Sequence, residues 1–152
     1  AKHLLEGDWR LLYTTSREIL GIDRFPLFNL GQIYQCIRPA EAKIYNIAEI
    51  VGLPFLEGLV SVAATFEPVS QLRVNVKFER YIVGLQRFFS YQSPAKFIKE
   101  IESGKKFLPL DFSIANRDRL GWLEITYLDE DMRIGRGNQG NVFVLAKEKN
   151  DI

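Results

Sequence analysis

The last third of the chain constrains the fold most, because it predicts a three-stranded antiparallel meander. The runs at 121–128 and 141–147 carry β-branched and aromatic residues that alternate with polar ones. The acidic triplet Asp129–Asp131 breaks the first run, and the tetrad Gly137–Gly140 supplies residues that tolerate positive φ at a tight turn. Such a meander is typical of the closing edge of a β-barrel, and a small barrel is first of all a container.

Glycines in this meander also match two nucleotide-binding motifs. Gly135, Gly137 and Gly140 have the spacing of the dinucleotide fingerprint, and Val142 with Lys147 extends the match to the kinase glycine-rich loop. The fingerprint needs a helix N-terminus after the glycines, whereas a strand is predicted here. The kinase loop needs a catalytic lobe downstream, and only twelve residues follow Gly140. The context therefore favours a turn over a nucleotide site.

Period-2 alternation predicts further strands along the rest of the chain. Ser93 and Pro94 predict the N-cap and first turn of one short helix that ends near Glu102, and 105–120 is expected to be irregular. Together with the meander, the strands number eight to nine. The fold class predicted is mainly β, a lipocalin-like antiparallel β-barrel that occupies 1–152 as a single domain. The further strands are expected at 7–16, 32–38, 43–51, 59–66, 71–80 and 81–91, the last interrupted at Gly84.

Composition excludes several classes of partner and site. The formal net charge is +1, with 20 basic and 19 acidic residues interspersed, which is too balanced for a nucleic-acid footprint. Cys36 and His3 are the single Cys and His of the chain, so neither an internal disulfide nor a structural metal site is expected. No apolar run approaches the roughly 20 residues that span a bilayer as a helix, so the protein is expected to be soluble or peripheral.

The sequence offers no recognisable catalytic constellation. With His3 alone there is no Ser-His or Cys-His pair in a plausible setting, and no nucleophile elbow is present. Asp129–Asp131 lacks the Gly and the bidentate Glu of a calcium loop, so a solvated acidic turn is favoured. Cys36 is interpreted as a small core residue. We therefore expect a protein that is not an enzyme and holds no metal and no cofactor.

Polar residues inside otherwise apolar strand faces suggest a cavity or a buried hydrogen bond. The inward sets are expected to be Ile33, Gln35 and Ile37 on one strand and Ile44, Asn46 and Ala48 on the next. Arg133 and Arg136 differ in parity, so one of them should point into the barrel. A buried guanidinium needs a partner, and three remain open: a carboxylate such as Glu49 or Glu124, backbone carbonyls that close the barrel, or a polar ligand head.

The connection at 17–30 is unusually apolar for a loop. Phe25, Leu27 and Phe28 could cap the barrel, or they could form an entrance that contacts lipid. Both interpretations stay open from the sequence.

Two blocks of sequence, 5–16 and 127–145, resemble the plastid lipid-associated protein or fibrillin family of cyanobacteria and plastids, and 44–48 and 66–78 are similar as well. The resemblance implies a barrel at the periphery of thylakoids or lipid globules (plastoglobules) of a photosynthetic organism. It also implies apolar ligands such as carotenoids, prenylquinones or acyl lipids, and it brings no catalytic residues. Gly7-x-Trp9 further resembles the first-strand signature of lipocalins, in which the Trp plugs the closed end and a late-strand Arg packs across it.

The expected function is therefore binding of a hydrophobic small molecule or lipid in the barrel interior. The alternative is a non-enzymatic coat or scaffold on lipid surfaces, with a filled barrel, that could hold an isoprenoid-quinone biosynthetic enzyme as protein partner. Trp9 is expected to close the barrel, and Phe25, Leu27 and Phe28 to contact membrane. The residues expected to bind the ligand are Tyr13, Tyr45, Phe78, Tyr127, Arg133 and Arg136.

Overall fold

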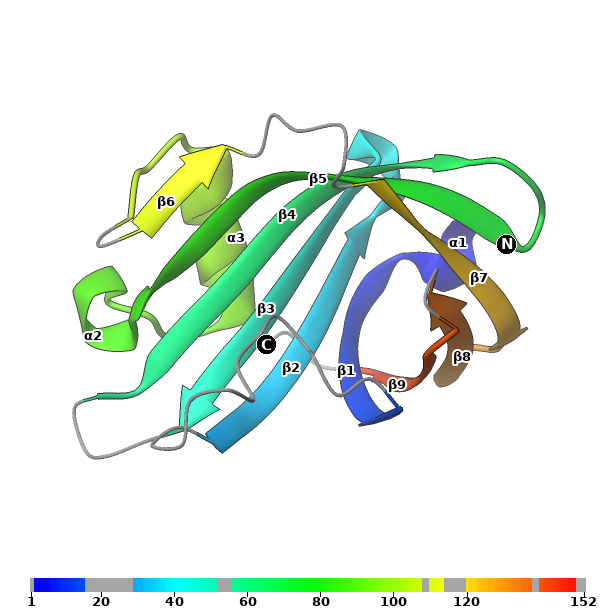
Figure 1. Cartoon of the computed structure of the whole chain (residues 1–152), viewed down its shortest axis with the longest axis horizontal. Helices are drawn as coiled ribbons and strands as arrows, with labels where there is room; N and C mark the ends of the chain where they lie inside the picture. Colours follow the sequence, from blue (N-terminus) through cyan, green and yellow to red (C-terminus); the bar gives the residue numbers. More distant parts are fainter. Residues whose placement is uncertain are drawn as a thin grey trace.

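The computed structural model describes residues 2–15, 29–51, 56–107, 110–113, 120–137 and 140–149. In these residues nine antiparallel strands form one sheet in the order β4-β3-β2-β1-β9-β8-β7-β5-β6, and β4 also pairs with β5. This second pairing closes eight strands into a barrel, which confirms the predicted fold class (Figure 1). The strands are β1 Gly7–Thr14, β2 Asn29–Arg38, β3 Lys43–Val51, β4 Gly58–Pro68, β5 Arg73–Leu85, β6 Leu110–Ser113, β7 Leu120–Leu128, β8 Met132–Gly137 and β9 Val142–Lys147.

The long strand β5 serves two partners along its length. Its first part, Arg73–Lys77, pairs with Leu120–Glu124 of β7 and closes the barrel. Its later part, Arg80–Val83, pairs with β6, which lies outside the closed circle. The barrel wall is therefore completed between β5 and β7 over only one part of β5.

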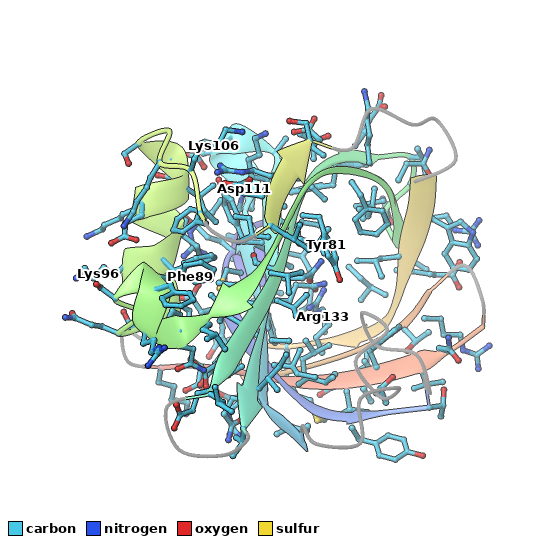
Figure 2. The ribbon with its side chains drawn as sticks, turned by 60° about the vertical axis from the view of Figure 1, so that its left-hand side comes forward. Tyr81, Phe89, Lys96, Lys106, Asp111 and Arg133 are labelled. Carbon is cyan, nitrogen blue, oxygen red and sulfur yellow. The ribbon has the colours of Figure 1, made fainter. Side chains whose placement is uncertain are left out.

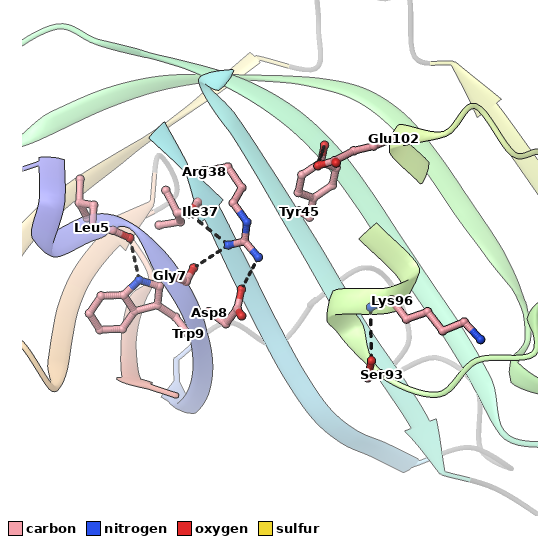
Figure 3. A network of polar contacts seen from close by, with 10 residues as sticks. All are labelled: Leu5, Gly7, Asp8, Trp9, Ile37, Arg38, Tyr45, Ser93, Lys96 and Glu102. Atoms are coloured by element: carbon pink, nitrogen blue, oxygen red, sulfur yellow. Dashed lines mark hydrogen bonds and ion pairs between the residues drawn. The ribbon is translucent and has the colours of Figure 1, made fainter. Parts of the chain in front are cut away.

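Short helices complete the described structure. The predicted helix is α3, Pro94–Glu102, and its first turn is capped because the Lys96 N–H donates to Ser93 Oγ (Figure 3). Three additional helical segments were not predicted: α1 Lys2–Leu5, the 3₁₀ turn η2 Pro39–Glu41, and α2 Gln86–Phe89.

Alternation along the strands separates two apolar clusters on opposite faces of the wall. Phe97, Ile98 and Ile101 of α3 pack on the outer face, and Figure 1 shows α3 against this part of the sheet. Cys36 belongs to the outer cluster, where burial raises the pKa of its thiol, as suits a core residue. The inner face carries the cluster around Trp9.

Two sequence predictions about elements were wrong in detail. Residues 71–80 and 81–91 are not two strands: β5 continues to Leu85, with a register shift opposite Ala63 and Ala64, and the chain then turns into α2. The stretch 105–120 was expected to be irregular, yet it contains β6.

The Asp129–Asp131 triplet is a turn as expected, since Asp129 Oδ1 accepts hydrogen bonds from the N–H groups of Asp131 and Met132.

Candidate ligand site in the barrel interior

Trp9 lies fully buried near the start of β1, where its ring is held from several sides. Its Nε1 donates to the Leu5 carbonyl at 2.9 Å, which ties the indole to α1 (Figure 3). The Lys147 ammonium lies 5.4 Å from the ring centroid and donates to the Leu4 carbonyl. Gly7 beside this group adopts a φ of +138°, a backbone conformation that residues with a Cβ rarely adopt, which favours glycine at this position.

Arg133 of β8 is the arginine that points into the barrel. Its guanidinium carbon lies 5.0 Å from the Trp9 ring centroid, and the residue is only 5% exposed. Its Nη2 donates to Gln35 Oε1, and its Nε is buried without a hydrogen-bond partner in the described part of the chain. Burial lowers the pKa of Arg133 to about 10, so the side chain is still charged at neutral pH.

The carboxylates considered as partners for this arginine bind elsewhere. Glu49 accepts a hydrogen bond from the Tyr91 hydroxyl, and Glu124 pairs with Arg73 at 2.7 Å. Among the described residues no Asp or Glu forms an ion pair with Arg133. Within the described residues, the buried Arg133 cation therefore has one hydrogen-bond partner, the neutral amide of Gln35, and no counter-charge.

A row of polar side chains crosses the inner face beside Arg133. Gln35 of β2 opposes Asn46 of β3, and Gln35 Nε2 donates to Asn46 Oδ1 at 3.0 Å. The same row continues through Val62 of β4 to Tyr81 of β5. Tyr81 and Arg133 are both labelled in Figure 2. We call Gln35, Asn46, Tyr81 and Arg133 the polar row.

Apolar residues border the polar row on both sides along the strands. On one side the partners belong to the Trp9 cluster, which also holds the aromatic residues Phe66, Phe78 and Phe143. On the other side lies a further cluster of the inner face, the second cluster, which is aliphatic apart from Tyr81: Ala48, Ile50, Val60, Ile33 and Val83. Since the bulky rings gather around Trp9, the part of the interior lined by the second cluster carries the smaller side chains.

The structure brings together some of the predicted ligand residues and separates others. Phe78 packs in the Trp9 cluster. The Arg133 guanidinium lies over the Trp9 ring of the same cluster. Tyr13 is 60% exposed and Tyr127 is 45% exposed, so neither lines the interior. A register shift follows Leu11 in β1 and another follows Ile125 in β7, and each reverses the alternation of the residues after it.

Tyr45 and Arg136 also lie outside the barrel. Tyr45 is buried, but it belongs to the outer cluster under α3, and its hydroxyl donates to Glu102 at 3.5 Å (Figure 3). Arg136 differs in parity from Arg133 and is exposed. Phe25, Leu27 and Phe28 lie outside the described residues, so the membrane-contact prediction stays a prediction.

Sequence reasoning named Gln35 and Asn46 as polar members of inward sets but did not place them in the site, and it missed Tyr81. The signal for both amides was their position on an alternating strand between apolar residues, isoleucines on both sides of Gln35 and an isoleucine before Asn46.

In the described part of the chain no group of three or more His, Cys, Asp or Glu could hold a metal ion. None of the helices in the same residues has the length and apolar character needed to cross a bilayer.

Comparison with known proteins places this barrel in a family. The family model described as PAP_fibrillin matches residues 1–146. The chain is 32% identical over 173 residues to the chromoplast-specific carotenoid-associated protein of Cucumis sativus, covering 95% of this chain and 53% of that protein. It is 30% identical over 174 residues to the chloroplastic plastid-lipid-associated protein of Citrus unshiu, with 95% and 53% covered.

A third relative is the chloroplastic light-induced protein of Solanum tuberosum, 30% identical over 174 residues, of which 95% of this chain and 52% of the relative are covered. The chain thus spans about half the length of the curated relatives it matches. No solved structure matches it. Because the family model covers all but the last six residues, the chain belongs to the PAP_fibrillin family.

Proposed function

We propose that this protein binds a hydrophobic small molecule inside its barrel, and that it works at the periphery of a thylakoid or lipid globule without catalysing a reaction. The observation that carries the proposal is the lining of the interior. An eight-stranded barrel is just wide enough either to be filled by side chains or to hold one small ligand. The large rings gather around Trp9, and smaller aliphatic residues line the second cluster.

The chemistry of the lining fits a long apolar molecule with one polar end. Aliphatic side chains such as Ile50, Val60 and Val83 would bury its chain, at roughly 25 cal/mol per Å² of apolar area removed from water. The polar row would hold the polar end. The relatives named for carotenoid or lipid association support this class of ligand, which includes carotenoids, prenylquinones and acyl lipids.

The two tryptophans allow a direct test, because they lie on opposite faces of the wall. Trp9 is inside, whereas Trp122 lies on the outer face, stacked 4.0 Å from the Arg73 guanidinium carbon. The variant Trp122→Phe retains Trp9 as the emitter, and Trp9→Phe retains Trp122. The probe is the methyl ester of 5-doxylstearic acid, whose nitroxide quenches fluorescence at short range.

Binding inside the barrel predicts saturable, one-to-one quenching of Trp9 in Trp122→Phe. In Trp9→Phe the quenching of Trp122 should be weaker, because the wall separates it from the probe. Quenching confined to Trp122, or no saturable quenching in either variant, would reject an internal ligand.

A second candidate function, attachment of the outer surface to lipid, is favoured by one observation. Tyr13 opposes Val144, Val144 opposes Ile134, and Ile134 opposes Tyr127, so an apolar row crosses the outer face of β1, β9, β8 and β7. Leu12 adds a further side chain that is 51% exposed. In the described residues α3 packs on a different part of the outer face.

Liposome co-sedimentation separates the two functions. Under the coat function, Tyr13→Ser with Tyr127→Ser, or Phe25→Ser with Phe28→Ser, should abolish liposome binding. Under the carrier function, quenching of Trp9 by the soluble probe should persist in the same variants. If the barrel is filled and the protein serves only as a coat or as a scaffold for a partner enzyme, the double-serine variants should lose liposome binding. The probe should then quench Trp9 neither in these variants nor in the protein without them.

A further inference from the structure

The uncompensated charge of Arg133 restricts the class of ligand further. The residue is 5% exposed. Among the described residues its one hydrogen bond is to the amide of Gln35, and its Nε has no partner. A buried cation without a counter-charge is costly, and a guanidinium matches a carboxylate with two parallel N–H···O bonds. The described residues thus leave a buried positive charge without a counter-charge.

Neighbouring groups orient the guanidinium toward such a partner. Gln35 Oε1 accepts from Arg133 while Gln35 Nε2 donates to Asn46 Oδ1, so the amide is fixed by a bond at each end. Asn46 uses its oxygen in this bond, which leaves its Nδ2 group as a further donor in the polar row. The Trp9 ring also supports Arg133, by a cation–π contact at 5.0 Å.

We infer that the polar row binds the carboxylate of a long-chain fatty acid, with the head group on Arg133 and the acyl chain along the second apolar cluster. This inference rests on the proposed function and narrows it to an acyl lipid with a free acid group. One arginine balances one negative charge, which a carboxylate carries and a phosphate monoester exceeds. A neutral carotenoid or quinone would leave the guanidinium uncompensated.

The direction of the chain follows from the register of the wall. Along each strand, two residues, or about 7 Å, separate the polar row from the second cluster. The pairs are Gln35 and Ile33, Asn46 and Ala48, and Tyr81 and Val83. On the other side of the polar row, the Trp9 cluster is occupied by large rings. The head group is therefore the end nearest Trp9, and the methyl end is the farthest from it.

The test compares an acid with its own ester in the Trp122→Phe variant. The inference predicts that 5-doxylstearic acid binds at least about tenfold more tightly than its methyl ester at neutral pH. Arg133→Met should reduce the affinity for the acid at least about tenfold and leave the affinity for the ester unchanged. Arg136→Met is the matched control on the same strand, where the side chain is exposed, and should change neither affinity.

Equal affinity for acid and ester, or full acid affinity in Arg133→Met, would overturn the carboxylate inference while leaving the proposed function intact. Absence of binding by both probes would overturn the proposed function as well. Should Arg133→Met fail to fold, the unaltered Arg133 protein still decides the question. With the head group on Arg133, 5-doxylstearic acid must quench Trp9 more strongly than 16-doxylstearic acid, and the reverse order contradicts the inferred orientation.

Discussion

The guanidinium of Arg133 lies over the ring of Trp9, with 5.0 Å between the guanidinium carbon and the ring centroid. This contact joins β8 to β1 across the interior, and Lys147 of β9 adds a second cation to the same ring at 5.4 Å. Three strands thus converge on one indole. The contact also fixes the position of the Arg133 charge within the polar row, next to Gln35, where the proposed ligand would meet it.

Trp9→Ala should destabilise the barrel strongly. The substitution removes a fully buried indole, its hydrogen bond to the Leu5 carbonyl and both cation–π contacts. We expect a loss of about 3–5 kcal/mol in the free energy of unfolding, measured by urea denaturation. Trp122→Ala is the control, since that ring is half-buried on the outer face, and its loss should be clearly smaller. Unchanged stability of Trp9→Ala would contradict the assignment of Trp9.

Gly135→Ala should be poorly tolerated, although the position lies in a regular strand. A Cβ at Gly135 would come within 2.8 Å of the Glu124 carbonyl oxygen, which belongs to the backbone of the paired strand and cannot turn away. We expect a loss of about 2 kcal/mol or more by thermal or urea denaturation. Gly137→Ala, two residues later, meets only Phe143 Cε2 at 3.4 Å and should be nearly neutral. Equal effects of the two substitutions would refute the close backbone approach.

Asp111→Asn should change how stability depends on pH. Hydrogen bonds from Arg80, and a further one from the Phe107 N–H, hold the pKa of Asp111 below its ordinary value of 3.8. Because the folded pKa is lower than the unfolded one, this stabilisation is complete above about pH 4 and is lost as the pH falls through the folded pKa. We expect Asp111→Asn to cost about 2 kcal/mol at pH 7. The difference between parent and variant should shrink in denaturation curves taken toward pH 2, and a difference that is constant with pH would contradict the ion pair.

Arg133→Met should raise the stability of the protein once it is freed of lipid. The substitution removes a buried charge whose pKa is lowered to about 10, and methionine keeps most of the packing against Trp9. Loss of the bond to Gln35 offsets part of the gain. We expect a net increase on the order of 1 kcal/mol in the free energy of unfolding, with little change in Arg136→Met. A large decrease would mean that Arg133 serves the fold and not a ligand.

Much of the wall followed from period-2 alternation, because alternation is what separates the two faces of a strand. The inward sets around Gln35 and Asn46 are where the sequence pattern put them, and their polar members form a part-buried hydrogen bond with one another. The inward arginine had to be one of two, and the structure shows that it is Arg133.

The misplaced tyrosines have a common physical origin in features that alternation cannot reveal. Tyr13 and Tyr127 each follow a register shift, and one extra residue in a strand reverses the face of every residue after it. Tyr45 is buried as an interior residue would be, but its burial comes from α3 packed on the outer face. A sequence pattern reports that a residue is covered, and it does not tell what covers it.

The most direct test of an occupied barrel is mass spectrometry of an organic extract from the protein, purified gently from its native cells. We expect one long-chain fatty acid per protein molecule, absent from Arg133→Met prepared in the same way and retained by Arg136→Met. An extract without any stoichiometric lipid from the parent protein would contradict an internal ligand, and a stoichiometric neutral carotenoid or quinone would contradict the role of Arg133.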